Sequence, residues 1–293
     1  MPDPGSPLPG TSAQRYLDAR RIRALAAELG LRPSKGRGQN FLLDANTVRK
    51  IVGLAQVGPA DVVLEIGPGL GSLTVGLLHA GPRVAAVEID PVLARQLPAT
   101  MADLAPTATG NLTVVERDAL TLREGEVAPT PTALVANLPY NIAVPVILHL
   151  LAAFPAIERG LVMVQKEVAD RLVAPPGSRV YGVPSVKLAW YAESSRVGLV
   201  PPTVFWPAPN VESGLVRFTR RQPPPGADRR TTFALIDLAF SQRRKMLRSV
   251  LTPRYGPGVL ATLDQAGIAP EARAETLDVT DFARLATYLL PVC

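Results

Sequence analysis

The chain has 293 residues, of which 47% are hydrophobic and 19% are charged, and its formal net charge is +6. This length allows one large domain with a substantial core and a second, smaller one. The single cysteine, Cys293, excludes an intrachain disulfide and a cysteine-based zinc site, and with only two histidines we expect no metal centre.

Positive charge is concentrated in two segments. Residues 1–40 carry a net charge of +4 and residues 217–256 a net charge of +8, so the remainder of the chain is acidic, at −6. Such a distribution is typical of a surface that binds a polyanion. Solvated helix faces would leave the same pattern.

The N-terminal segment, residues 1–14, is rich in proline and glycine and lacks the apolar stretch of a signal peptide. We expect it to be a disordered tail. A basic helix is predicted over Gln14–Leu31. A second helix is predicted from Asp44, as its N-cap, to Ala55.

Short apolar runs then alternate with helical patterns. The first five runs are separated by helical segments, which indicates a parallel sheet covered on both faces and hence a doubly wound α/β domain. The last two runs would close the sheet with an antiparallel edge. The predicted strands are Val62–Ile66, Val84–Glu88, Leu112–Val115, Ala133–Ala136, Leu161–Val164, Val197–Val200 and Gly214–Phe218.

Residues 127–157 contain no charged side chain and resemble a membrane span in this respect. Five prolines interrupt the segment and break any helix of spanning length. We therefore predict a buried strand, a polar loop and a buried helix here. The protein is expected to be cytoplasmic, with no membrane association.

The proline-rich residues 223–226 mark a linker. Beyond it the sequence predicts only helices, over Phe233–Leu251, Gly258–Ala266 and Asp281–Leu290. The predicted organisation is a tail (1–14), a catalytic domain (15–222) and a small all-helical C-terminal domain (223–293).

A glycine-rich segment, residues 65–71 (EIGPGLG), follows the first predicted strand and opens a helix. Its G-x-G-x-G pattern differs from the G-x-G-x-x-G of dinucleotide-binding enzymes. Glycines such as Gly67 let the backbone approach a ligand closely. Taken alone, the segment is weak evidence, because some glycine-rich segments are merely tight turns.

Acidic residues end the next two strands. Glu88 lies 21 residues beyond Gly67, where an acid binds ribose hydroxyls, and Asp118 follows the third strand, where it would accept a hydrogen bond from an adenine amino group. Acids suit a cationic sulfonium better than a pyrophosphate. The three strand ends together predict S-adenosylmethionine, and not NAD, as the ligand.

The fourth strand ends in Asn137, Leu138, Pro139 and Tyr140. Adenine N6 is a poor nucleophile because its lone pair is delocalised into the ring. The Asn137 side-chain oxygen and the Leu138 carbonyl would accept hydrogen bonds from this amino group, and Tyr140 would stack on the base. Catalysis would rest on orientation and electrostatics, without a strong general base. The alternative interpretation is a buried asparagine beside a core tyrosine.

These motifs resemble the small-subunit (16S) rRNA adenine dimethyltransferase family (KsgA/RsmA), from about Lys35 to Leu289. One departure is Ala143-Val144, where the family usually has Ser-Thr. The matching segments are residues 38–42 (GQNFL), 65–71, 137–142 (NLPYNI), 164–169 (VQKEVA), 181–182 (YG), 205–209 (FWPAP) and 240–245 (FSQRRK).

The resemblance implies a Rossmann-like class I methyltransferase whose seven strands, numbered along the chain, take the order 3-2-1-4-5-7-6. It implies that the enzyme dimethylates N6 of two adjacent adenosines in the 3′-terminal hairpin loop of 16S rRNA, in an immature small subunit and as a monomer. Tyr140 and Phe205 would sandwich the flipped adenine, although Phe205 on its own would be read as a packing aromatic. The residues implied to contact S-adenosylmethionine are Asn40, Leu42, Gly67, Glu88, Asp118 and Asn137.

A basic cluster, Arg243, Arg244 and Lys245, is predicted on the outer face of a helix, where it would contact RNA phosphates. Three alternatives to the 16S enzyme remain. They are a 23S rRNA adenine methyltransferase, a ribosome-assembly or transcription factor without catalysis, and a glutamine- or DNA-directed enzyme with an N/D-P-P-Y loop. Leu138 weighs against the first and third, and the intact acids Glu88 and Asp118 weigh against loss of activity.

Overall fold

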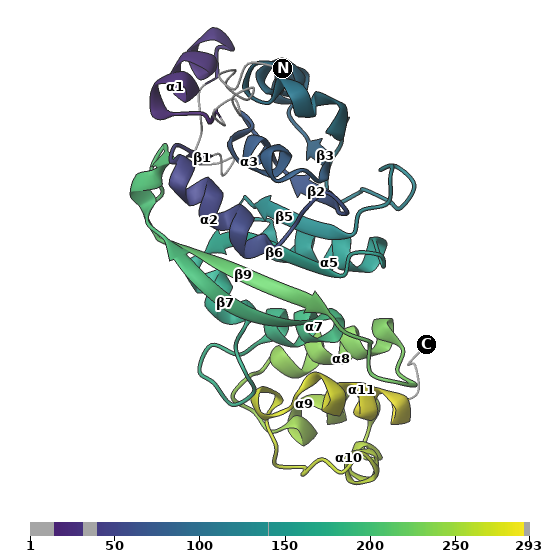
Figure 1. Ribbon diagram of the computed structural model, residues 1–293. Coiled ribbons are helices and arrows are strands. Elements are labelled where there is room, and N and C mark those ends of the chain that lie inside the picture. Colours follow the sequence, from purple (N-terminus) through teal and green to yellow (C-terminus); the bar gives the residue numbers. More distant parts are fainter. Residues whose placement is uncertain (1–14, 32–39, 140, 290–293) are drawn as a thin grey trace, which may run out of the picture.

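A computed structural model describes residues 15–31, 40–139 and 141–289, and its central element is a seven-stranded sheet (Figure 1). The strand order is β4-β3-β2-β5-β6-β9-β7, which is the predicted order. Strands β2 to β6 pair in parallel, whereas β9 runs antiparallel between β6 and β7. The strands are β2 (Val62–Ile66), β3 (Arg83–Glu88), β4 (Leu112–Glu116), β5 (Ala133–Asn137), β6 (Arg159–Gln165), β7 (Ala192–Val200) and β9 (Ser213–Arg220).

Helices cover both faces of this sheet, as the apolar strands require. Because side chains alternate along a strand, Val63 of β2 packs into one core and its neighbour Leu64 into the other. The first core lies under α1 (Ala19–Glu28), α2 (Ala45–Ala55), α3 (Ser72–Ala80) and α4 (Pro91–Leu104). The second lies under α5 (Ala143–Ala153), α6 (Lys166–Leu172) and α7 (Val183–Tyr191).

Aspartates set the starts of the first two helices. The Asp44 carboxylate accepts a hydrogen bond from the Thr47 amide at 2.7 Å, which confirms Asp44 as the N-cap of α2. The first helix is shorter than predicted. It begins at Ala19 because Asp18 caps the Arg21 amide at 2.7 Å.

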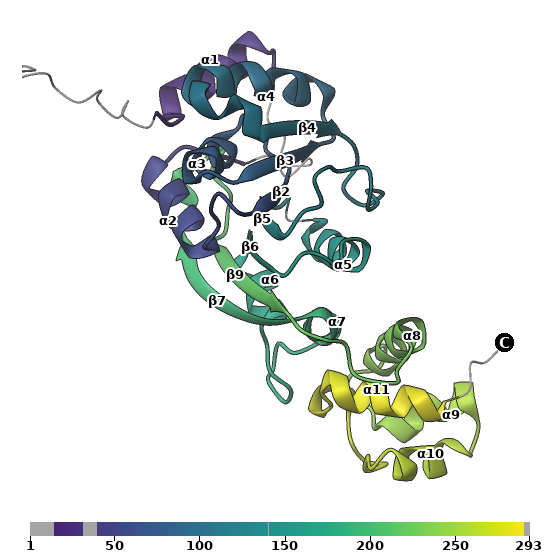
Figure 2. The same ribbon diagram turned by 45° about the vertical axis from the view of Figure 1, so that its right-hand side comes forward.

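The C-terminal part is helical, and Figure 2 shows it beyond α7 on the β7–β9 side of the sheet. Its helices are α8 (Arg229–Phe240), α9 (Leu247–Tyr255), α10 (Val259–Gln265) and α11 (Val279–Tyr288). The prediction of one helix over Phe233–Leu251 is wrong, because the chain turns at residues 241–246. There the Leu247 amide donates to the Ala272 carbonyl at 2.8 Å, and Met246 forms a β-bridge with Arg273. These long-range backbone bonds replace the continuation of α8.

A second, two-stranded sheet was not predicted. In it β1 (Phe41–Leu42) pairs antiparallel with β8 (Phe205–Trp206). The pairing brings together the start and the later part of the α/β region (Figure 1). Among the described helices, none is long and apolar enough to cross a membrane.

Candidate active site

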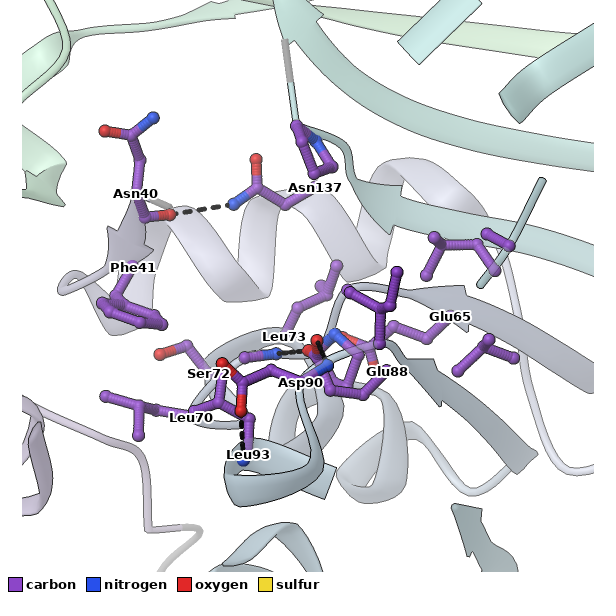
Figure 3. Close-up of a pocket in the computed structure, with 18 of the residues that line it drawn as sticks. Asn40, Phe41, Glu65, Leu70, Ser72, Leu73, Glu88, Asp90, Leu93 and Asn137 are labelled. Carbon is purple, nitrogen blue, oxygen red and sulfur yellow. Dashed lines mark hydrogen bonds between the residues drawn. The ribbon is translucent and has the colours of Figure 1, made fainter. Parts of the chain in front are cut away.

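A cavity of about 470 Å³ lies at the carboxyl ends of β2, β3, β4 and β5 (Figure 3). This is the edge at which parallel α/β sheets bind their ligands. Its volume lies within the range of small-molecule sites. All six residues predicted to contact the cofactor line it, namely Asn40, Leu42, Gly67, Glu88, Asp118 and Asn137.

The glycine-rich loop after β2 forms one wall of this cavity. Gly69 has a positive φ of 59°, and a Cβ atom at this position would lie 3.0 Å from Cε1 of Phe41. Gly71 has a φ of 95°, and a Cβ there would lie 2.6 Å from Cε of Met101. The positive φ therefore favours glycine at these two positions, and a larger residue would also crowd the neighbouring side chains.

Glu88 joins this loop to the end of β3. Its Oε2 atom accepts a hydrogen bond from the Gly69 amide at 3.1 Å, and its Oε1 atom accepts one from the Asp90 amide at 3.0 Å. The side chain is only 6% exposed, and burial raises the pKa of its carboxyl above the ordinary value. Each carboxylate oxygen keeps a further acceptor position, which ribose hydroxyls would use.

Glu65 also lines the cavity, although the sequence did not single it out as a site residue. Burial, together with a smaller effect of the nearby Glu88 charge, raises the pKa of this carboxyl to about 8. Its Oε2 atom is buried and has no hydrogen-bond partner among the described residues. Its place just before the glycines, at the end of a buried strand, was the available signal.

The lining fits a cationic adenosyl ligand. Two buried carboxyl groups, Glu65 and Glu88, lie in one wall, and a bound positive charge would favour their ionised forms. Asp118 follows β4, and its Oδ1 atom accepts from the Leu120 amide at 2.9 Å. Leu42 is held by its carbonyl, which accepts from the Ser72 hydroxyl at 2.7 Å. Ile89 and Pro91, which sequence reasoning missed, add apolar surface for a flat ring.

Asn137 ends β5 and reaches the cavity with one half of its amide already engaged. Its Nδ2 atom donates to the Asn40 carbonyl at 3.2 Å (Figure 3). This bond uses the donor side of the amide and leaves Oδ1 as the acceptor. The sequence motif indicated the residue but not its anchor, because the two positions lie 97 residues apart.

The other residues predicted to be catalytic do not present their side chains to the cavity in the described part of the chain. Leu138 is 1% exposed, its side chain packs in the core, and its amide donates to the Met163 carbonyl at 3.0 Å. Its predicted role involves only its main-chain carbonyl. Phe205 is 3% exposed and packs in the core beside Leu42, so the structure does not bring it to the cavity wall. Tyr140 lies outside the described residues.

The basic cluster lies in the turn before α9 and not on a helix. The Arg243 guanidinium pairs with Glu275 at 2.8 Å and donates to the Arg179 carbonyl at 2.7 Å. It therefore holds the α6–α7 loop against the C-terminal helices. Arg244 and Lys245 are exposed, so two of the three cations are accessible to a phosphate.

Comparison with known proteins shows the family. Residues 32–290 match the model of ribosomal RNA adenine dimethylase. The chain is 60% identical over 279 residues to ribosomal RNA small subunit methyltransferase A of Cutibacterium acnes. The aligned region covers 92% of this chain and 93% of the relative.

Two solved structures resemble the whole fold. A dimethyladenosine transferase from Plasmodium falciparum superposes with a TM-score of 0.73 and 26% identity, covering 84% of this chain and 95% of that one. The 23S rRNA methyltransferase ErmE superposes with a TM-score of 0.62 and 30% identity, covering 85% and 99% respectively. The chain belongs to the ribosomal RNA adenine dimethylase family.

Proposed function

We propose that the protein dimethylates N6 of two adjacent adenosines in the 3′-terminal hairpin loop of 16S rRNA. Family membership supports the reaction, S-adenosylmethionine as methyl donor and rRNA as substrate. The observation that carries the catalytic site is the Asn137 amide, because its donor half is bonded to the Asn40 carbonyl and its acceptor half remains for a substrate amine.

The residues of the cavity divide into binding and activating groups. S-adenosylmethionine, when bound, supplies an electrophilic methyl group on a sulfonium. Glu88 would hold ribose hydroxyls, and the unpaired Glu65 oxygen would face positive charge. The Asn137 oxygen and the Leu138 carbonyl would accept hydrogen bonds from the adenine amine, which lets its nitrogen pyramidalise toward the methyl. Tyr140 would stack on the extruded base, whereas Phe205, which is buried beside Leu42, would have to leave the core to reach it.

Two methylations need the same acceptors. The unmodified amine carries two N–H groups, and the singly methylated product still carries one, so an acceptor remains useful in both rounds. Each transfer would break the S–CH3 bond of one donor molecule, form one N–CH3 bond and release one proton from nitrogen to water, with S-adenosylhomocysteine as the leaving group. A strong base is not required, because this proton becomes acidic only as the new bond forms.

The wider setting is part of the same proposal. Residues 15–222 would form the catalytic domain and residues 223–293 a helical domain whose exposed Arg244 and Lys245 meet rRNA phosphates. The enzyme would act in the cytoplasm, as a monomer, on an immature small subunit.

Labelled S-adenosylmethionine and unmethylated small subunits test the proposal. We expect label on two adjacent adenines of the 3′-terminal hairpin, two methyl groups on each, and no label with Asn137→Ala. Label elsewhere in 16S rRNA, or none, would overturn the assignment.

The likeness to ErmE favours one second candidate, methylation of adenine in 23S rRNA. Protein-free 23S rRNA should therefore be offered in parallel under the same conditions. Methylation of 23S rRNA with the small subunit left unlabelled would establish this alternative in place of the proposed substrate.

A further inference from the structure

The β1–β8 ladder connects the cofactor cavity to a segment far along the chain. Phe41 pairs with Trp206 and Leu42 with Phe205, and the Leu43 amide extends the pairing by donating to the Val204 carbonyl at 2.8 Å. The first strand supplies cavity lining, whereas neither residue of β8 touches the cavity. Among the described residues, the backbone pairing with β1 connects residues 205–206 to the cavity wall.

Side chains add a second connection to this backbone pairing. The Trp206 indole stacks on the Phe41 ring with a centroid distance of 6.3 Å and an interplanar angle of 28°. The Phe41 ring also lies against the glycine loop, where a Cβ on Gly69 would lie 3.0 Å and 3.1 Å from two ring carbons. The Phe41 ring thus contacts both the Trp206 indole and the glycine loop.

The Phe41 ring has little room to move while the Trp206 indole is present. Phe41 is buried and Trp206 is half-buried, so removal of the indole would leave space beside the Phe41 ring. Gly69 in turn donates its amide to Glu88 at 3.1 Å. Displacement of Phe41 would release the wall that sets the Glu88 carboxylate.

We propose that Trp206 is a positioning residue for the cofactor. Its indole holds Phe41 against the glycine loop and thereby preforms the wall that carries Glu88. This rests on the proposed function in one respect, that the adenosyl donor occupies the cavity. Because coupling is reciprocal, a bound cofactor also stabilises β8 and the position of Phe205.

Cofactor affinity without RNA tests the inference. Binding of S-adenosylhomocysteine is measured by calorimetry for the parent protein, Trp206→Leu and Trp206→Phe. Loss of an aromatic partner should raise the dissociation constant by about threefold to tenfold, and the Phe variant should restore most of the affinity. The matched control is Phe233→Leu, since Phe233 is also half-buried and packs edge-on against Trp190 at 5.8 Å, away from the cavity. It should bind as the parent does.

A double-mutant cycle tests whether Trp206 affects cofactor binding through Phe41. If Trp206 acts through Phe41, the effects of Phe41→Leu and Trp206→Leu on the dissociation constant are less than multiplicative in the double variant. Multiplicative effects, or a Trp206→Leu affinity within twofold of the parent, would overturn the inference and leave the proposed function intact. No binding by the parent protein would overturn both.

A direct optical readout applies if Trp206→Leu does not fold. The chain has only two tryptophans, so Trp190→Phe makes Trp206 the sole indole fluorophore. Saturation with S-adenosylhomocysteine should then change its emission or reduce its quenching by acrylamide. Unchanged emission and quenching would contradict the proposed contact.

Discussion

Replacing Glu65 by glutamine should remove a large part of the pH dependence of this protein's stability. The carboxyl is buried in the cavity wall, and its Oε2 atom has no hydrogen-bond partner among the described residues. Burial raises its pKa from 4.5 to about 8. Glutamine has nearly the same shape and keeps the site neutral at every pH.

The direction and the size of the pH effect on the free energy of unfolding follow from this pKa shift. Between pH 4.5 and 8 the folded protein holds a proton that the unfolded chain has lost, so the free energy of unfolding falls as pH rises. The contribution is complete below pH 4.5 and is lost as pH rises through 8. One proton corresponds to about 1.4 kcal/mol per pH unit, and the whole shift to at most about 5 kcal/mol.

Urea unfolding without cofactor, at pH 5.5, 6.5 and 7.5, measures the effect. The free energy of unfolding of the parent should fall by about 1 kcal/mol per pH unit relative to that of Glu65→Gln. Glu124→Gln, which neutralises an exposed carboxylate in a loop, should keep the slope of the parent. If Glu65→Gln shows that slope as well, the carboxyl is not protonated in the folded protein.

The other predictions concern the cofactor, the substrate amine and RNA. Asn137→Ala should lower the methylation rate by about 100-fold or more, because it removes an acceptor for the amine, while calorimetry still detects cofactor binding; normal turnover would exclude the assigned role. Glu88→Gln should weaken cofactor binding by about tenfold or more, and an unchanged dissociation constant would argue against the ribose contact. Replacing Arg244 and Lys245 by alanine should reduce the slope of log affinity for rRNA against log salt by about 2, and an equal slope would leave them as solvated charges. Arg243→Ala should instead lower the melting temperature, since it removes an ion pair and carbonyl contacts; an unchanged melting temperature would refute this structural role.

The sheet was predictable because each of its strands can be recognised from a short, continuous stretch of sequence. Each strand reads as a short apolar run, the helical segments between the first five require parallel pairing, and the carboxyl ends of parallel strands define the cavity. Glu88, Asp118 and Asn137 could therefore be placed at one edge of the sheet from the sequence alone. Their positions on the cavity wall agree with that expectation.

The features that escaped prediction depend on contacts between distant residues. A two-residue strand such as Phe41–Leu42 is too short to show a periodic pattern, and its partner lies more than 160 residues away. The helix predicted over Phe233–Leu251 breaks because the Leu247 amide bonds to Ala272. The raised pKa of Glu65 reflects complete burial, which follows from packing and not from the motif.

The Asn137–Asn40 bond explains why position 137 suits asparagine and not aspartate in this fold. An amide presents a donor and an acceptor, and here the donor is taken by a main-chain carbonyl 3.2 Å away. A carboxylate would place a second acceptor oxygen against that carbonyl, and the two would repel each other. The amide instead fixes its own orientation, so that its oxygen is the atom left for the substrate amine. The segment that lines the cofactor cavity thus also orients the Asn137 amide, the group that we propose accepts a hydrogen bond from the adenine amine.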